Sequence, residues 1–178
     1  MIWPYLLALV SVSGSPVLVD SQHSSIDIAV KATIGSFVAK LQDFDASVTM
    51  ASHVAQVEAG VLRFNFASIK TGNAGRDRDM NKWQQTDRFP EVVFTLIAIE
   101  PGAGGTPIAR GKLRFHGVER LMSFPISVET KDQTIDLDGD VPIDTRDYGL
   151  PIIKDFLVLK VDPIVHVHFH LLGKLVDS

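Results

Sequence analysis

Apolar and polar residues alternate one by one through most of this sequence, and this alternation restricts the fold more than any other feature. From Ser25 almost to the C-terminus, runs such as SIDIAV and LRFNF place apolar residues at every second position. Successive residues of a β-strand point to opposite faces of the sheet, so each run has one apolar face and one polar face. Turn-forming residues separate the runs, as in PGAGGT at 101–106. The pattern predicts an antiparallel all-β domain with little helix.

Nine apolar runs follow from this alternation, and they amount to about eight amphipathic strands. Their apolar faces are carried by Ile26, Ile28 and Val30; Phe37, Ala39 and Leu41; Phe44, Ala46, Val48 and Met50; Leu62, Phe64 and Phe66; Val92, Phe94, Leu96 and Ala98; Leu113 and Phe115; Met122, Phe124, Ile126 and Val128; Ile135, Leu137, Gly139, Val141 and Ile143; and Val165, Val167, Phe169 and Leu171. A sheet of this size buries one face best by closing on itself, which also removes its exposed edges. We therefore predict an eight-stranded antiparallel barrel with one short helix.

The segment GNAGRDRDMNKWQQTDRFP, residues 72–90, departs from the strand pattern and predicts that helix. Met80 and Trp83 share one helix face, and Pro90 marks the return to strand. Asn73 is a candidate N-cap, although turn chemistry alone also explains it together with Gly72 and Gly75. Two interpretations are open, because the helix either caps one mouth of the barrel or rests on its surface.

The first 15 residues have the pattern of a signal peptide. An apolar run from Tyr5 to Val12 is followed by small residues, as in the h-region and cleavage zone of an export signal. The run is too short to span a bilayer. We predict a signal peptide over residues 1–15 and a single exported domain over 16–178 with no transmembrane segment in the mature chain. The alternative is an N-terminal arm or strand that packs on the domain.

Composition limits the partners of the chain. A length of 178 residues suits one domain with a single closed core. The formal net charge is −4 and the lysines and arginines are scattered, so no basic stripe is available for nucleic acid. The absence of cysteine excludes a disulfide framework and a thiolate site.

Three histidines alternate in VHVHFH near the end of the chain, at 166, 168 and 170. In a strand their imidazoles share one face, and the outer two lie roughly 13 Å apart, too far to bind one tetrahedral ion together. A two-histidine site would need further ligands from neighbouring strands. We therefore expect a solvated strand face, no bound metal and no cofactor.

No catalytic motif is present in the sequence. It lacks a G-x-S-x-G nucleophile elbow, a phosphate-binding loop and a dinucleotide fingerprint. RDRD at 76–79 and DTRDYG at 144–149 place carboxylates beside arginines, a pattern more typical of ion pairs that fix a loop than of acid–base catalysis. We predict that the protein is not an enzyme.

The strand phases aim an unusual number of large apolar side chains toward the interior. The candidate ligand-binding residues are Phe37, Phe44, Leu62, Phe64, Phe66, Met80, Trp83, Phe94, Leu96, Leu113, Phe115, Phe124, Ile126, Leu137, Val141, Val167 and Phe169. A small barrel either fills its interior with such residues or leaves a tunnel for one hydrophobic ligand. Phase alone does not decide between the two. Gly139 shares the inward phase, and its missing side chain suggests room beside a ligand.

Several short motifs, in order, resemble the YceI-like family of lipocalin-like, polyisoprenoid-binding proteins over roughly Val19 to Leu172. The family pattern contains a Ser-Ile-x-Thr-Gly strand end, an Arg-Asp helix start, a Phe-Pro before a strand, a Gly-x-Leu strand ending in His-Gly-Val, and an Arg-x-[FY]-Gly turn. In this chain the pieces are Ser68 to Gly72, Arg76 with Asp77, Phe89 with Pro90 and Phe94, Gly111 with Leu113 and His116 to Val118, and Arg146 with Tyr148 and Gly149. Asp79, Trp83 and Leu96 depart from the residues that are frequent in the family.

The resemblance implies a lipocalin-like barrel that is usually periplasmic and holds a long isoprenoid chain, such as a polyprenyl lipid or an isoprenoid quinone, in an apolar tunnel. It implies a non-catalytic lipid-binding carrier. The alternative function is a ligand-free structural or stress-response barrel whose interior is solidly packed. The oligomeric state is left open, a homodimer included.

Overall fold

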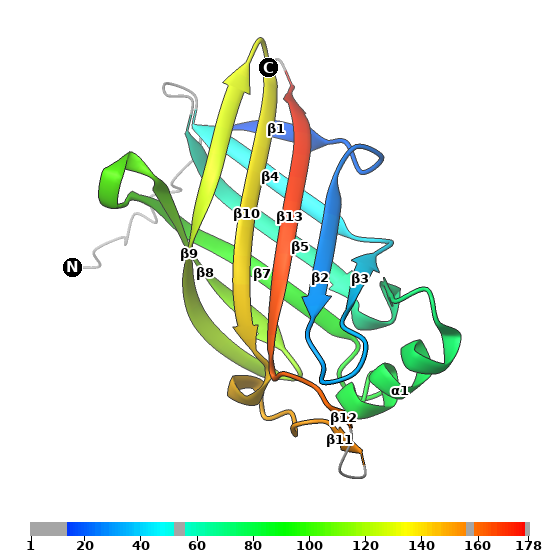
Figure 1. The fold of residues 1–178 in the computed structure, drawn as a ribbon. Helices are drawn as coiled ribbons and strands as arrows, with labels where there is room; N and C mark the ends of the chain where they lie inside the picture. The colour runs from blue at the N-terminus through cyan, green and yellow to red at the C-terminus, as the bar shows by residue number, and fades with distance from the viewer. Residues whose placement is uncertain (1–13, 52–55, 156–158, 177–178) are drawn as a thin grey trace, which may run out of the picture.

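The structure is a computed structural model that describes residues 14–51, 56–155 and 159–176. It contains a twisted antiparallel barrel with a single α-helix at one end (Figure 1). Most of the predicted signal peptide lies outside the described residues. The first strand begins at Gly14, so Gly14 and Ser15 belong to the sheet and pair with Ala51 and Met50.

Strands make up most of the described chain. They are β1 (Gly14–Val19), β2 (Ser25–Val30), β3 (Phe37–Leu41), β4 (Asp45–Ala51), β5 (Val57–Asn65), β6 (Ile69–Lys70), β7 (Glu91–Pro101), β8 (Pro107–Phe115), β9 (Val118–Lys131), β10 (Thr134–Asp144), β11 (Lys154–Asp155), β12 (Leu159–Lys160) and β13 (Ile164–Leu175). The helical elements are α1 (Ala74–Gln84) and the 3-10 turns η1 (Phe66–Ser68), η2 (Ala103–Gly105) and η3 (Thr145–Tyr148). Among the described residues, no helix has the length and apolar composition required to cross a bilayer.

Closure of the barrel depends on β1. The hydrogen-bonded order runs from β1 through β4, β5, β7, β8, β9 and β10 to β13, and β13 pairs back to β1. These strands form a closed ring of eight, which confirms the predicted antiparallel barrel. The longest ladder joins β10 to β13, with residues 134–144 opposite 164–174.

The short strands β2, β3 and β6 extend the barrel wall from β13. β13 pairs with β1 at residues 173–175 and with β2 at residues 166–170, so β1 and β2 share one edge of β13. β3 pairs with β2 and, through Lys40 and Leu41, with β6. This part of the wall lies beside α1 (Figure 1).

The helix begins where its sequence predicts. The Asn73 side chain accepts a hydrogen bond of 3.0 Å from the Arg76 backbone N–H, which confirms Asn73 as the N-cap. Gln85 ends the helix in the left-handed region at φ 56°, and its N–H bonds back to carbonyls of the last turn. Because Gln84 is fully buried and bonds the Phe89 carbonyl, the segment after the helix is also fixed.

Candidate ligand-binding cavity

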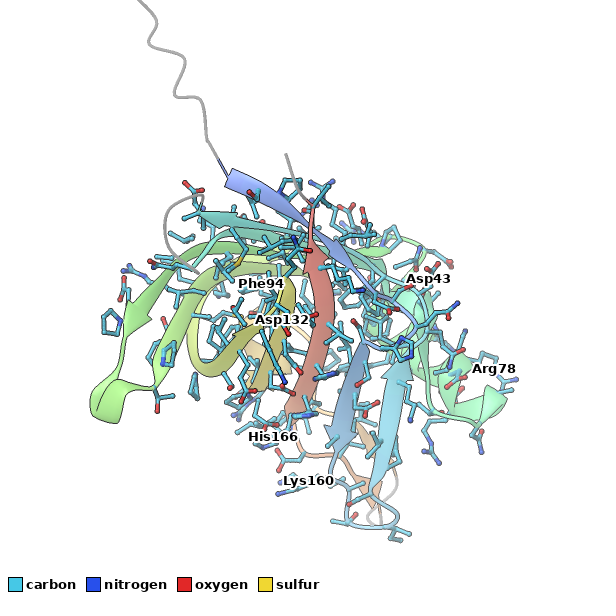
Figure 2. All side chains as sticks on the ribbon, turned by 90° about the horizontal axis from the view of Figure 1, so that it is seen from above. Asp43, Arg78, Phe94, Asp132, Lys160 and His166 are labelled. Atoms are coloured by element: carbon cyan, nitrogen blue, oxygen red, sulfur yellow. The ribbon has the colours of Figure 1, made fainter. Side chains whose placement is uncertain are left out.

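An apolar cavity of about 1020 Å³ occupies the barrel interior. Its walls come from the inward faces of β2, β3 and the ring strands other than β1, and from α1 and the segments 34–35 and 151–153. Figure 2, which looks onto the molecule from above, shows Phe94 inside the ring of strands and Arg78 outside it on the helix side. A volume of this size is at the upper end of the range of roughly 300 to 1,000 Å³ that is common for small-molecule pockets.

All but one of the candidate ligand-binding residues line this cavity. They are Phe37, Leu62, Phe64, Phe66, Met80, Trp83, Phe94, Leu96, Leu113, Phe115, Phe124, Ile126, Leu137, Val141, Val167 and Phe169. Phe44 is the exception, because it lies between β3 and β4 and packs against the core cluster without lining the cavity. Their contact with a ligand stays a prediction.

The predicted phase of β7 is wrong after Leu96. The pairing of β7 with β8 shifts between Leu96 and Ala98, so one extra residue stands in β7 at this point. A β-bulge of this kind reverses which residues face inward. Ile99 therefore lines the cavity in place of Ala98, and Ile97 is 47% exposed.

The interpretation of Gly139 as free room beside a ligand is also wrong. A Cβ built on Gly139 would lie 2.5 Å from the Phe169 ring, the residue directly opposite on β13. The aromatic ring therefore occupies the space that the missing side chain leaves. By contrast, a Cβ on Gly60, which lines the cavity, would lie at ordinary contact distances of 3.5 Å from Leu96 and 3.9 Å from the Ser47 carbonyl oxygen.

One end of the cavity is closed by packed side chains. Met50 and Ile135 are 2% and 1% exposed, and they belong to a buried cluster formed mainly by β1, β4, β5 and β10. Val57 and Leu137 of the same cluster line the cavity, whereas Met50 and Ile135 lie behind its wall. The lining at this end of the cavity is therefore largely apolar.

The other end is open at α1. Exposed residues that line the cavity gather there: Ile34 and Gly35 from the β2–β3 loop, Asn73 and Asp79 from the helix, and Pro151 and Asp162 from the segment that leads into β13. Met80 and Trp83 of α1 face the same end, and the Trp83 indole N–H donates to the Pro151 carbonyl at 2.8 Å. Of the two interpretations of the helix, the structure supports the one in which it caps a mouth.

The mouth carries the polar groups of the site. The Arg76 guanidinium lies 4.0 Å from the centre of the Phe37 ring, a cation–π contact, and both residues line the cavity. No ion pair of Arg76 occurs among the described residues, so its donors remain available to a ligand. Hydrogen bonds from the Thr71 hydroxyl and backbone N–H, at 2.6 and 2.9 Å, lower the pKa of the neighbouring Asp77.

The sequence did not identify this polar rim. Asn73, Arg76, Asp79, Thr145 and Asp162 all line the cavity near the mouth, but they come from three segments that the topology brings together. The only available signal was the Arg-Asp motif, which was interpreted as a loop-fixing ion pair. Both Arg-Asp motifs do contain an ion pair, because Arg78 lies 3.7 Å from Asp79 and Arg146 donates to the Asp144 carboxylate at 2.9 and 2.5 Å. Arg76 of the first motif lines the cavity instead.

Three motifs of the family pattern meet at one place in the fold. The His116 Nδ1 lies 2.9 Å from the Tyr148 carbonyl oxygen, and the His116 ring packs edge-on against Phe89 at 4.5 Å. Gly117 has a positive φ of 73°, and a Cβ there would lie 2.8 Å from the Phe89 ring. The Phe-Pro, His-Gly-Val and Tyr-Gly motifs thus stabilise the barrel end that carries η3.

The histidine strand faces outward, as its alternation predicts. Val165, Val167, Phe169 and Leu171 line the cavity, whereas the His168 side chain is 51% exposed and the His170 side chain 32% exposed. The opposite strand, β10, places Asp140 opposite His168 and Asp138 opposite His170. The face is therefore a ladder of carboxylates and imidazoles, which the sequence pattern of β13 alone does not reveal.

Solved structures with this fold come from several bacteria. The crystal structure of Burkholderia cenocepacia BcnA superposes with a TM-score of 0.75 at 22% identity, covering 86% of this chain and 98% of that one. A polyisoprenoid binding domain from Saccharophagus degradans, implicated in plant cell wall breakdown, gives a TM-score of 0.67 at 14% identity over 92% and 99% of the two chains. The Campylobacter jejuni YCEI protein gives 0.70 at 14% identity over 81% and 88%.

At these identities the structural matches establish the fold and nothing finer. A comparison with curated proteins gives no significant match. The sequence itself matches the family model of the YceI-like domain over residues 18–172, which is most of the chain and agrees with the span of the motifs. The protein therefore belongs to the YceI-like family.

Proposed function

We propose that this protein is a non-catalytic carrier that holds the chain of an isoprenoid lipid, either a polyprenyl lipid or an isoprenoid quinone, inside its barrel. The observation that carries the proposal is the apolar cavity of about 1020 Å³, closed at one end and open at α1. A solidly packed structural barrel would not contain such a space. The related domain from Saccharophagus degradans, described as polyisoprenoid binding, supports the same ligand class.

The energetics of burial suit this ligand. Each buried methylene-sized group contributes about 0.8 kcal/mol, so a five-carbon isoprene unit contributes roughly 3 to 4 kcal/mol before ordering is subtracted. A few units in the cavity are enough for tight binding without any directional contact. The tail would point to the Met50 and Ile135 end and the head group to the mouth.

At the mouth, Arg76 is the residue that we expect to contact the head group. Its guanidinium faces the cavity and is held in place by the Phe37 ring. Guanidinium donors bind acceptor oxygens, which both a quinone carbonyl and a phosphate provide. Among the described residues the cavity lining contains no histidine, cysteine or lysine, and this composition supports a binding role over a catalytic one.

Export to the periplasm is part of the proposal. It is supported by the apolar run from Tyr5 to Val12 and the small residues after it. An isoprenoid carrier outside the cytoplasm would move or store a lipid that is too apolar to cross the aqueous space alone.

The test is to fill the cavity without disturbing the wall. Gly60→Leu adds a side chain at an inward position with room for its Cβ, and we expect it to exclude the lipid and leave the fold intact. Thr95→Leu is the matched control, because it puts the same side chain on the exposed face of the neighbouring strand β7. Organic extracts of each purified protein would be analysed by mass spectrometry, and unfolding midpoints would be measured on lipid-free samples.

Co-purified isoprenoid in the wild type and in Thr95→Leu, with little in Gly60→Leu and a similar midpoint, is the expected result. If the wild type carries no isoprenoid and binds none on incubation with an isoprenoid quinone or a polyprenyl phosphate, the barrel is a structural protein. A large fall in the midpoint of Gly60→Leu would show that the interior is already filled, since overpacking a solid core costs about 1 to 3 kcal/mol.

A further inference from the structure

The outer faces of β10 and β13 place the three histidines of β13 in three different settings. Their cross-strand partners on β10 are Pro142 for His166, Asp140 for His168 and Asp138 for His170. Among the described residues, only His170 has two carboxylates within ion-pair distance, the second being that of Asp136 two residues earlier on the same face of β10. The alternating histidines are therefore chemically distinct, and His170 is the one surrounded by ligand-type groups.

Donor atoms converge at His170. Its Nδ1 lies 3.2 Å from Asp138 Oδ1 and 3.2 Å from Asp136 Oδ1, and atoms of all three groups lie within 4.8 Å of one another. The three side chains are 32 to 42% exposed, so one side of the cluster is open to solvent. The strands that carry them are joined by the longest ladder of the barrel, which fixes their spacing.

Hydrogen bonding within the cluster leaves one atom without a partner. A ring N–H points in one direction, and the Nδ1 of His170 bonds the Asp138 carboxylate. The Asp136 Oδ1 atom is shielded from solvent and has no hydrogen-bond partner, although Nδ1 is equally close to it. A single proton on His170 therefore cannot serve both carboxylates, whereas a cation between the three groups would.

Carboxyl groups outnumber the imidazole around Asp136. Glu129 of β9 is the cross-strand partner of Asp136, and Asp138 lies on the same face of β10. A bound cation would offset the repulsion between these carboxylates.

We propose that Asp136, Asp138 and His170 form a binding site for a divalent transition-metal ion, for which Zn²⁺ is the best match. With metal–ligand distances of about 2.0 to 2.1 Å, two donors of a tetrahedral zinc site lie about 3.3 Å apart, close to the 3.2 Å that separates Nδ1 from each carboxylate oxygen. An imidazole nitrogen beside two carboxylates suits zinc better than magnesium or calcium, which prefer oxygen ligands. Solvent on the open side supplies the remaining ligand.

This site lies outside the cavity and is independent of the proposed lipid. Asp136, Asp138 and His170 are absent from the cavity lining, and their inward-facing neighbours Leu137 and Phe169 belong to it. The expectation of a metal-free histidine face rested on the spacing of the histidines and on the need for further ligands from neighbouring strands. The pairing of β10 with β13 adds two aspartates, which together with one imidazole make three metal ligands.

The chain offers a matched control two residues along the same strand pair. His168 Nδ1 lies 3.4 Å from Asp140 Oδ2, and these side chains are 51% and 72% exposed. Asp27 of β2 is the other cross-strand partner of His168, but among the described residues only Asp140 lies within ion-pair distance of it, whereas His170 has two such carboxylates. Substitution at His168 therefore removes an imidazole of similar position without removing the proposed site.

The experiment is a calorimetric titration of Zn²⁺ into the full chain without a histidine tag, in lipid-loaded and lipid-stripped form. We expect one ion per chain in both forms, and an excess of Mg²⁺ that does not displace it. Asp136→Asn and His170→Gln should each weaken binding by at least about tenfold, whereas His168→Gln and Asp140→Asn should change it less than about threefold. Circular dichroism of each variant in chelator checks that the barrel is folded.

A second measurement is made on the unmodified chain. Binding of Co²⁺ should give visible absorption bands and shift the imidazole resonances of His170 far more than those of His166 and His168. The proposal is overturned if no saturable binding of either ion occurs, if several ions bind per chain, or if His168→Gln weakens binding as much as His170→Gln. Each of these results would leave the cluster as an ion pair of His170 with Asp138.

Discussion

The two ends of the barrel interior are built differently. At the closed end, Met50 and Ile135 are almost completely buried and side chains from opposite walls pack on one another. At the mouth, Ile34 is 60% exposed and the lining includes charged residues such as Arg76 and Asp79. The same barrel thus has an end where apolar side chains pack on each other and an end where they line the cavity.

This difference assigns separate roles to the two ends. Close packing makes the closed end sensitive to any change in volume, because removed atoms leave a cavity that the neighbours do not fill. At the mouth the side chains already border a space, so changes there alter the ligand's surroundings more than the stability of the fold. The proposed carrier therefore takes its stability from one end and its selectivity from the other.

The largest expected effect is at the closed end. Ile135→Ala should lower the free energy of unfolding by about 2 to 5 kcal/mol, because the side chain is 1% exposed and contacts the buried cluster. Denaturant unfolding of lipid-free protein measures this loss. The control at the mouth is Ile34→Ala, which should change the same free energy by less than about 0.5 kcal/mol. Equal losses at the two positions would contradict the division of roles.

A smaller effect is expected at the hydrogen bond that holds α1 at the mouth. Trp83→Phe removes the indole N–H that donates to the Pro151 carbonyl at 2.8 Å and should cost about 0.5 to 1.5 kcal/mol. Hydrogen exchange should rise in α1 while β10 stays protected, since the bond connects the helix to the segment before β11. Met80→Leu is the control, because it keeps the apolar volume on the same helix face. Faster exchange in β10 as well would mean that the two ends unfold as one unit.

The residues of the cavity wall could be predicted from the sequence, because side chains along a strand point alternately to the two faces of the sheet. Once Phe64 or Phe115 is assigned to the apolar face, its direction follows from alternation, and both residues line the cavity. The exceptions are places where the period breaks. The extra residue after Leu96 turns Ile99 inward in place of Ala98, and Phe44 lies at a gap between two strands.

The polar groups were not predictable in the same way, because they depend on which strands and loops become neighbours. Arg76 reaches the cavity only because α1 lies across the mouth beside Phe37 of β3. Asp136 meets His170 only because the register of β10 against β13 aligns residues 34 positions apart. Register over such a separation is set by the whole barrel and leaves no local signal.

The smallest expected effect is a loss of stability near the mouth that depends on pH, whereas the loss at the closed end does not. The hydrogen bonds from Thr71 lower the pKa of Asp77 below its ordinary value of 3.8, so the folded chain holds this carboxyl ionised more readily than the unfolded chain does. A lowered folded-state pKa gives stability that is complete above the unfolded value and is lost as the pH falls below 3.8 through the folded value.

Asp77→Asn should therefore reduce the free energy of unfolding by less than about 1 kcal/mol at neutral pH, and its difference from the wild type should shrink on acidification. Ile135→Ala titrates nothing, so its loss should be the same at both pH values. Urea unfolding of the three proteins near neutral pH and near pH 3 checks this. A difference for Asp77→Asn that persists unchanged in acid would mean that the Thr71 contact acts through shape and not through charge.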